Sequence, residues 1–218
     1  MQTLVNVVSN VVGLPSLSKT VFKYLLIQRP KEEDIPVATQ CFDVEKVYLR
    51  PTDTLLSQGG DHPSKDPDMV TTPQLSDDWE VEYSFIRKRS QGGINVYGMT
   101  TVVHRKLDGS RMELKRIISA REYSHTKIAN ADPERNVVQQ RRICFLWDNA
   151  SYHIHHYISP IDEFDILHVQ TEGSNDFEVP PFLKLGPPIS DDGDMSAFKI
   201  SLKQPNTPSS TPTREMMK

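Results

Sequence analysis

The clearest alternation of hydrophobic and polar positions in this chain runs from Trp79 to Glu122. Successive side chains of a β-strand point to opposite faces. A strand that begins at Trp79 therefore places hydrophobic and aromatic residues on one face, followed on that face by Arg87 and Arg89. A fold normally buries its aromatic side, so this pattern directs two arginines toward the interior. For this strand alone, an equally good interpretation is that it leaves the core and its arginines spread into solvent.

Two more strands follow, separated by a turn at Gly92-Gly93 and a hairpin-like turn with Asp108-Gly109 at its centre. In the last of them Arg111, Glu113 and Lys115 share one face, so neighbouring strands can present basic side chains and one acid to a common side. In a closed barrel this side is a polar lumen that suits phosphate. A flat antiparallel sheet with one solvated, salt-bridged face fits the same spacing. In the middle strand, between the two turns, the residues that share one face are Tyr97, Met99, Thr101, Val103 and Arg105.

The remaining pattern predicts an α+β protein, an antiparallel barrel or sandwich of about eight strands with one or two helices. Ser119 and Glu122 form a capping box, which predicts a helix from there to about Ala131. Runs rich in β-branched and aromatic residues predict the other strands. These are expected over residues 19–30, 39–51, 136–147, 151–158 and 164–171, with a last edge strand over 196–202.

The chain of 218 residues is long enough for one domain with tails. We expect the domain over residues 19–203, interrupted at 52–78 by a loop rich in Gly, Pro, Ser, Thr and Asp that is predicted to be mobile. Residues 1–15 have the composition of a short amphipathic helix or docking segment. The proline-rich and serine-rich end, 204–218, is predicted to be a disordered tail.

Composition narrows the classes of partner. The net charge of −4 gives no overall electrostatic case for nucleic acid, so a phosphate site has to be a local patch. Cys41 and Cys144 could form one bridge, but nothing marks secretion, and reduced packing residues are the favoured interpretation. No hydrophobic run approaches the length of a membrane span. A cytoplasmic location is therefore expected.

The order and spacing of several segments resemble the CYTH domain, the triphosphate-tunnel barrel family of adenylate cyclases and thiamine or inorganic triphosphatases. The similarity is closest to the CYTH-like C-terminal half of proteins related to the TRPL translocation defect protein. Those relatives carry a P-loop domain ahead of the barrel; residues 1–15 resemble its last helix, and no GxxxxGK[ST] motif occurs in this chain. P-loop nucleotide binding is therefore not expected. The segments that carry the resemblance are FKYLLI, VEKVYL, FIRKR, YGMTTVVHR, RMELKRIISAREY, VVQQRRICFLW and LHVQTEG.

Departures from the family pattern bear on catalysis. Enzymes of the family open with two metal-holding glutamates at alternate positions, followed by a phosphate-binding lysine. Matching that lysine to Lys23 puts Lys19 and Val21 where the acids belong, and neither can ligate Mg²⁺. His155 stands at the place of a family aspartate, which leaves Glu113 as the one clearly retained strand acid. The resemblance thus implies a domain without catalysis, metal or cofactor. The alternative is a residual triphosphatase that uses Glu113 with rearranged loop acids.

The remaining matched positions are basic, and the resemblance implies a lumen that binds a phosphate-bearing ligand through guanidinium forks. A phosphoinositide headgroup, a polyphosphate and a nucleotide phosphate all fit, and the first would place the protein peripherally on membranes. Alternatively, some of these side chains pair with Glu45, Glu80, Glu82 or Glu113 or lie at the solvated mouth of the barrel, or the domain serves only as a protein-interaction scaffold. The predicted ligand-binding residues are Lys23, Arg87, Arg89, Arg105, Arg111, Glu113, Lys115 and Arg141.

Two other groups invite a chemical interpretation. His153, His155 and His156 lie close together, but no nearby Cys or carboxylate completes a tetrahedral zinc set, so packing or lumen lining is favoured. Cys144 has no base at a recognisable spacing and is predicted to be a buried thiol.

Overall fold

The computed structural model describes residues 19–36, 39–51, 77–161, 164–172, 176–190, 193 and 195–203. Over these residues the chain forms one antiparallel sheet with two short α-helices and a 3₁₀ turn, Glu32–Asp34. The helices are α1 (Ala120–Asn130) and α2 (Ala197–Ile200). The strands are β1 (Lys19–Gln28), β2 (Gln40–Tyr48), β3 (Trp79–Gln91), β4 (Ile94–Arg105), β5 (Arg111–Ile117), β6 (Val138–Trp147), β7 (Ala150–Ser159), β8 (Asp165–Glu172) and β9 (Lys184–Pro188).

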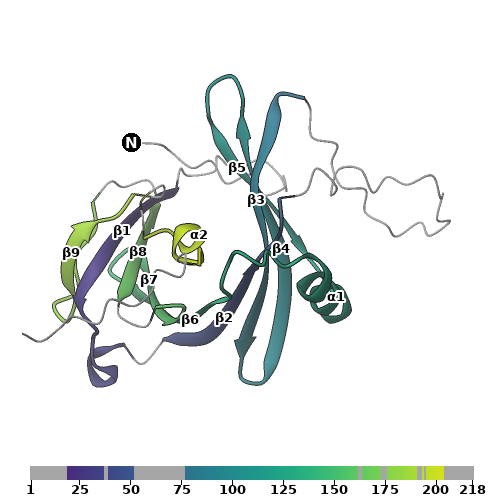
Figure 1. The fold of residues 1–218 in the computed structure, drawn as a ribbon. Helices are drawn as coiled ribbons and strands as arrows, with labels where there is room; N and C mark the ends of the chain where they lie inside the picture. Colours follow the sequence, from purple (N-terminus) through teal and green to yellow (C-terminus); the bar gives the residue numbers. More distant parts are fainter. Residues whose placement is uncertain are drawn as a thin grey trace, which may run out of the picture.

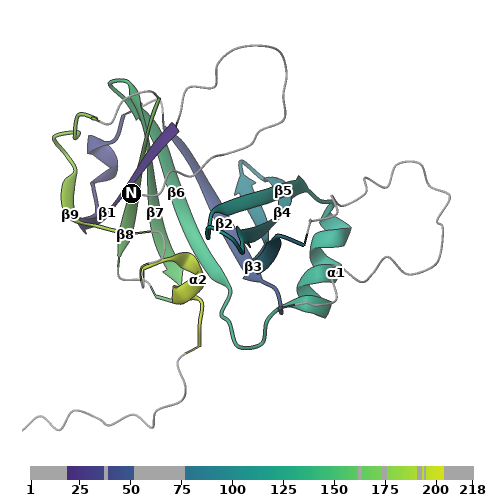
Figure 2. The same ribbon diagram turned by 90° about the horizontal axis from the view of Figure 1, so that it is seen from above.

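The strand order is β5-β4-β3-β2-β6-β7-β8-β1-β9. Among the described residues β5 and β9 are the two edges and do not pair with each other, so the sheet is open and closure into a barrel is not observed. Figures 1 and 2 show the curvature, with strands β3 to β5 on one side, β7 to β9 on the other, and α2 between them. We call β5-β4-β3-β2 the β3 arm and β6-β7-β8-β1-β9 the β7 arm. The pairing of β2 with β6 joins them.

Helix α1 covers the outer face of the β3 arm, as Figure 1 shows. The Ser119 hydroxyl accepts a hydrogen bond from the Glu122 amide at 3.1 Å, which confirms Ser119 as the predicted N-cap, while the Glu122 carboxylate contacts Arg116 at 2.6 Å. On the facing strand β2, one Glu45 carboxylate oxygen accepts hydrogen bonds from the Tyr123 hydroxyl and the Lys127 ammonium group, both at 2.6 Å. The helix is therefore fixed by the buried Tyr123 ring, which packs in a hydrophobic cluster with Val47 and Ile86, and by these polar contacts.

Turn chemistry explains the two long hairpins of the β3 arm. Gly92 and Gly93, between β3 and β4, have φ of 55° and 80°, and Gly109, between β4 and β5, has φ of 68°. Residues with a side chain rarely adopt such left-handed backbone angles, whereas glycine does so without steric cost. Both turns were predicted from the sequence, and they set the register that brings the faces of β3, β4 and β5 together.

The predicted edge strand over 196–202 is wrong, because this segment contains α2. The Ser196 hydroxyl caps the helix by accepting from the Lys199 amide at 3.3 Å. Phe198 stacks on Tyr83 of β3 with ring centroids 4.1 Å apart, which holds α2 against the concave face. The edge strand is instead β9, in the proline-rich segment; prolines are tolerated there because an edge strand leaves some amides without a ladder partner.

Several predictions fall on other parts of the chain. Residues 1–15, 204–218 and nearly all of 52–78 lie outside the described residues. Neither described helix is long and apolar enough to cross a membrane. Both cysteines are free thiols, as favoured, but Cys41 is exposed, so the predicted packing role is wrong for that residue.

Candidate anion-binding site

The concave face of the sheet encloses a cavity of about 430 Å³ between the two arms, with residues 195–198 along one side. We call it the central cavity. Basic side chains dominate its charged lining, and Glu113 is the one carboxylate among the described residues that line it. The β3 arm and the β7 arm both contribute cations. These are Lys46, Arg87, Arg111 and Lys115 from the first, and Lys23 and Arg142 from the second.

Lys46 lies on β2, at the junction of the two arms, and is the cross-strand partner of Arg87 on β3. Its ammonium nitrogen is 5.2 Å from the centroid of the Phe85 ring. Burial lowers the pKa of Lys46 well below its ordinary value, and the nearby charges of Arg142 and Arg87 lower it further. No described carboxylate forms an ion pair with Lys46.

Arg87 and Arg142 face the same space from opposite arms. Burial lowers the pKa of Arg87, and the neighbouring charge of Arg89 adds to the effect. Burial, followed by the charge of Arg87, lowers the pKa of Arg142 to about 10. The Arg142 Nε and Nη2 groups donate to the same oxygen of Gln140 at 3.2 and 2.9 Å, a neutral acceptor that leaves the charge uncompensated. Neither guanidinium has an ion-pair partner among the described residues.

The cations on β5, by contrast, have acidic partners. Arg111 Nε lies 2.8 Å from Glu82 Oε2, and Arg111 Nη2 donates to Glu82 Oε1 at 2.9 Å. The Lys115 ammonium nitrogen is 2.6 Å from Glu113 Oε2. For these two residues the salt-bridge alternative raised by the sequence is confirmed. The Lys115–Glu113 pair is substantially exposed, and exposed ion pairs contribute little and rearrange easily.

Histidines line the part of the cavity formed by the β7 arm. The rings of His155 on β7 and His168 on β8 lie 4.0 Å apart, centroid to centroid. Burial lowers the pKa of both rings well below the ordinary value, aided by Arg142 for His155 and by Lys23 for His168. Both are therefore neutral at pH 7 and can each present a ring N–H to an anion. The predicted lining role is confirmed for His155 and His153.

His156 lies outside the cavity lining. Its Nδ1 is 2.8 Å from an Asp165 carboxylate oxygen, and Arg29 contacts the other oxygen of that carboxylate at 3.1 Å. The difference from its neighbour His155 follows from the alternation of side chains along β7. Within the described part of the chain, no group of three or more His, Cys, Asp or Glu side chains is arranged to hold a metal ion.

Cys144 has a base beside it that the sequence did not reveal. The pairing of β6 with β7 brings its sulfur to 3.1 Å from His153 Nδ1, while His153 Nε2 lies 2.9 Å from the Ser151 hydroxyl. Burial raises the pKa of the Cys144 thiol, even though the Arg142 charge opposes the shift. The thiol is thus neutral at pH 7, and it is half-buried where a buried thiol was predicted.

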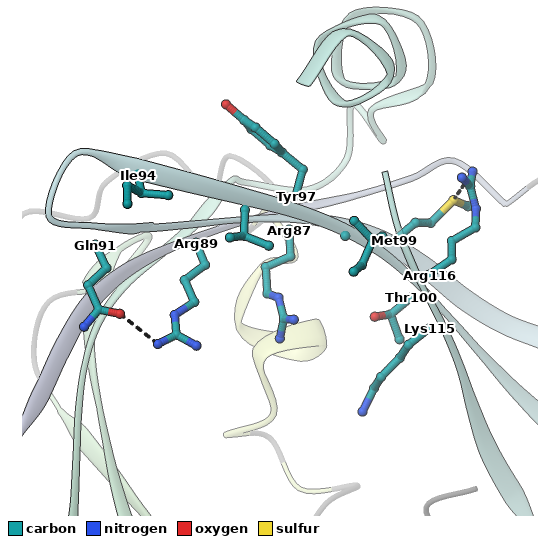
Figure 3. A pocket seen from close by; sticks show the side chains of 12 residues that line it. Arg87, Arg89, Gln91, Ile94, Tyr97, Met99, Thr100, Lys115 and Arg116 are labelled. Atoms are coloured by element: carbon teal, nitrogen blue, oxygen red, sulfur yellow. Dashed lines mark hydrogen bonds between the residues drawn. The ribbon is translucent and has the colours of Figure 1, made fainter. Parts of the chain in front are cut away.

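A second hollow of about 460 Å³, the hairpin hollow, lies beside the tip of the β3–β4 hairpin. It shares Arg87, Thr100 and Lys115 with the central cavity. Figure 3 shows Arg87, Arg89 and Lys115 projecting to one side of the sheet, while Tyr97 projects to the other, toward α1. The Arg89 guanidinium donates to Gln91 at 2.9 Å and lies 3.7 Å from the centroid of the Phe42 ring.

Some of the predicted ligand-binding residues line the central cavity and others do not. Arg105 lines neither hollow, which corrects its predicted position. It shares a face of β4 with Tyr97 and Met99, which pack in the cluster under α1, and its Nη1 lies 3.8 Å from Asp108. Arg89 lines only the hairpin hollow. The residues that do line the central cavity as predicted are Lys23, Arg87, Arg111, Glu113 and Lys115.

Arg141 is exposed, and the neighbouring residue Arg142 lines the cavity in its place. The family resemblance selected Arg141, one residue away from the position that faces the cavity; Gln140 also lines the cavity, on the same face of β6 as Arg142. Lys46 was also missed. Its signal is present in the sequence, because Lys46 alternates with Val44 and Tyr48, so a lysine occupies a position on a hydrophobic face.

Comparisons with known proteins assign no family. No family model matches this chain, and no curated protein matches it. The PH1819 protein of Pyrococcus horikoshii OT3 has a similar structure, with a TM-score of 0.41 and 13% identity over 70% of this chain and 77% of that chain. A conserved hypothetical protein of Pyrococcus furiosus gives a TM-score of 0.37, 13% identity and coverages of 72% and 81%. The PH1012 protein of Pyrococcus horikoshii OT3 gives a TM-score of 0.37 and 15% identity over 72% of this chain and 80% of that chain.

Proposed function

We propose that the central cavity binds a phosphate-bearing anion without the help of a metal ion. The observation that carries the proposal is the convergence of Lys46, Arg87 and Arg142 on one space without an acidic partner among the described residues. Buried charges that lack a counter-charge are costly. An anion between the arms would offset this cost, and guanidinium groups match phosphate oxygens in bidentate geometry.

The spread of the cations favours a ligand with more than one phosphate. Lys23 and Arg142 approach from the β7 arm, and Arg87 and Lys46 from the β3 arm, so a single small anion cannot neutralise all of them. A volume of about 430 Å³ suits a small molecule. Candidates that share this chemistry are a polyphosphate, a nucleotide phosphate and a phosphoinositide headgroup. The last would bring the protein to the surface of a membrane from the cytoplasm.

Binding rather than turnover is proposed because the acids needed for metal-assisted phosphoryl transfer are scarce at this site. Glu113 is the carboxylate among the described lining residues, and Lys115 already contacts it at 2.6 Å. Family-type chemistry uses carboxylates to hold the metal that spreads the charge of the transferred phosphoryl group. A degenerate triphosphatase would show itself by a requirement for Mg²⁺.

Calorimetric titration of the full chain with tripolyphosphate and inositol phosphates tests the proposal. Binding in EDTA that Arg87→Ala and Arg142→Ala weaken, and that Arg141→Ala on the opposite face leaves unchanged, is the expected result. Absence of binding in EDTA would contradict the proposal, and phosphate release that depends on Mg²⁺ would favour the enzyme. Sedimentation with phosphatidylcholine vesicles, with and without phosphoinositide, separates a lipid from a soluble source of the ligand.

A further inference from the structure

Lys46 has a setting that differs from that of Lys115, another lysine of the cavity. Lys115 contacts Glu113 at 2.6 Å, whereas Lys46 has no acidic partner in the described part of the chain. It sits at the joint between the arms, and the guanidinium groups of Arg87 and Arg142 are the charges that influence it most. It also keeps partial contact with solvent through the cavity. Lys46 is thus an amine in a cationic, partly desolvated and accessible place.

This setting controls the reactivity of an amine. A protonated ammonium group has no lone pair for attack, and an exposed lysine is protonated at pH 7 because its pKa is about 10.4. Burial and neighbouring cations both favour the neutral amine, which is how lysines become nucleophiles toward carbonyl groups. The lowered pKa of Lys46 has these two causes in that order.

We propose that Lys46 is a carbonyl-reactive amine that forms an imine with phosphate-bearing aldehydes or ketones, while Arg87 and Arg142 hold the phosphate group. The inference rests on the proposed function for the phosphate anchor. It adds a covalent site and a narrower ligand class, because the ligand has to carry a carbonyl group within reach of the Lys46 nitrogen.

The reaction needs no oxidant or reductant. The neutral nitrogen of Lys46 forms a bond to the carbonyl carbon, the π electron pair of the carbonyl moves to oxygen, and one N–H proton passes to that oxygen to give a carbinolamine. The nitrogen lone pair then expels the hydroxyl group, which leaves as water after gaining a proton, and the second N–H proton is released to solvent. The imine forms with loss of one water molecule, and hydrolysis reverses every step. Phosphate oxygens near the imine nitrogen would stabilise its protonated form among the surrounding cations.

Pyridoxal 5′-phosphate is a suitable probe, because it carries both an aldehyde and a phosphate and its imine is trapped by borohydride. The full chain is treated with a limiting amount of probe at pH 7, reduced, digested and analysed by mass spectrometry. We expect Lys46 to be modified more than about tenfold faster than the exposed Lys106, since each unit of lowered pKa gives ten times more free amine. Pyridoxal, which lacks the phosphate, should show much less preference for Lys46.

Protection and variants complete the test. Tripolyphosphate should protect Lys46 but not Lys106, and Arg142→Ala should reduce labelling of Lys46, while the matched variant Arg141→Ala should not. Equal labelling of Lys46 and Lys106 in the unaltered protein would overturn the inference. If tripolyphosphate still binds to that same sample in calorimetry, the proposed function remains intact. If neither preferential labelling nor binding is observed, the proposed function and the further inference are both contradicted.

Discussion

Lys46 and Arg87 are direct cross-strand partners on the concave face of the sheet, so two basic side chains occupy neighbouring positions where opposite charges would be stabilising. Both have a lowered pKa, and burial is the largest cause for each. Like charges in direct opposition destabilise a sheet. This pair therefore indicates that the empty protein gives up stability at the place where the anion is proposed to bind.

Removal of one of these charges should stabilise the empty protein. In the variant Lys46→Met the hydrophobic stem is retained and the amine, which is protonated in the unfolded chain but disfavoured as a cation in the fold, is lost, so we expect the free energy of unfolding to rise by about 1–2 kcal/mol. Urea denaturation measures the change, and binding of tripolyphosphate should weaken in the same variant. The control Lys106→Met removes an exposed charge and should alter neither quantity. A destabilised Lys46→Met protein would show that the charge is compensated.

The two adjacent arginines of β6 should differ sharply in their effect on binding. A hydrogen bond to a charged group contributes about 1.5–3 kcal/mol, so Arg142→Ala should weaken binding of tripolyphosphate by roughly 10-fold to 100-fold. Arg141→Ala should leave affinity unchanged, because Arg141 is exposed on the other face. Calorimetry of both variants under one salt condition makes the comparison. A larger loss in Arg141→Ala would place the ligand outside the central cavity.

Stability should fall in acid because of the buried histidines. His155 and His168 have a lowered pKa in the folded state, so below about pH 6.5, the ordinary value for histidine, the unfolded chain binds more protons than the folded one. Stability is therefore retained above that pH and declines as the pH falls through it. Thermal denaturation from pH 8 to pH 5 should show the decline, and it should be smaller in the double variant His155→Phe plus His168→Phe.

The same groups link ligand binding to protons. A bound polyphosphate favours the charged forms of Lys46, His155 and His168, so binding should take up protons and tighten as the pH falls from 8 to 6. Calorimetry in two buffers with different ionisation enthalpies measures the uptake directly. His104 contacts Glu80 at the surface, and His104→Asn serves as the control. Binding with no proton uptake would mean that the ligand leaves these three groups untouched.

The attachment of α1 should depend on Glu45. One of its oxygens accepts from both Tyr123 and Lys127, and Glu45→Ala would leave both donors without that acceptor. We expect a loss of about 1–3 kcal/mol in the free energy of unfolding, measured by urea denaturation. Glu80→Ala, which removes a more exposed carboxylate of the same sheet, should cost less than about 1 kcal/mol.

Much of the sheet could be predicted because its signals are local. The alternation along β3 and β5 correctly placed Arg87, Arg111 and Lys115 on a common side, and the capping box at Ser119 correctly started α1. The match to the family pattern failed on β6, where Gln139-Gln140 is followed by two arginines, because identical neighbours let a match slip by one residue. The sequence could not predict that the sheet is open. Closure into a barrel depends on the curvature summed over the nine described strands, and the sequence of one strand does not determine that sum.

The segment that forms α2 shows a different limit. Its hydrophobic residues alternate, which is typical of a strand, but the stacking of Phe198 on Tyr83 and the cap at Ser196 favour one helical turn. The stacking is a tertiary contact and the cap depends on a single residue, so the periodicity of hydrophobic residues reveals neither of them. The proximity of Cys144 to His153 was missed for the related reason that strand pairing creates it. Lys46 differs, because its alternation with Val44 and Tyr48 could have been recognised in the sequence.

The junction between the arms has a consequence for how ligand binding can be observed. In the described part of the chain, the ladder from Gln40 to Lys46 against Val138 to Cys144 is the one strand pairing that joins the arms. An anion held by cations of both arms would act as a second connection across the cavity. Amide hydrogens in this ladder should then exchange more slowly when the cavity is filled, although none of them touches the ligand.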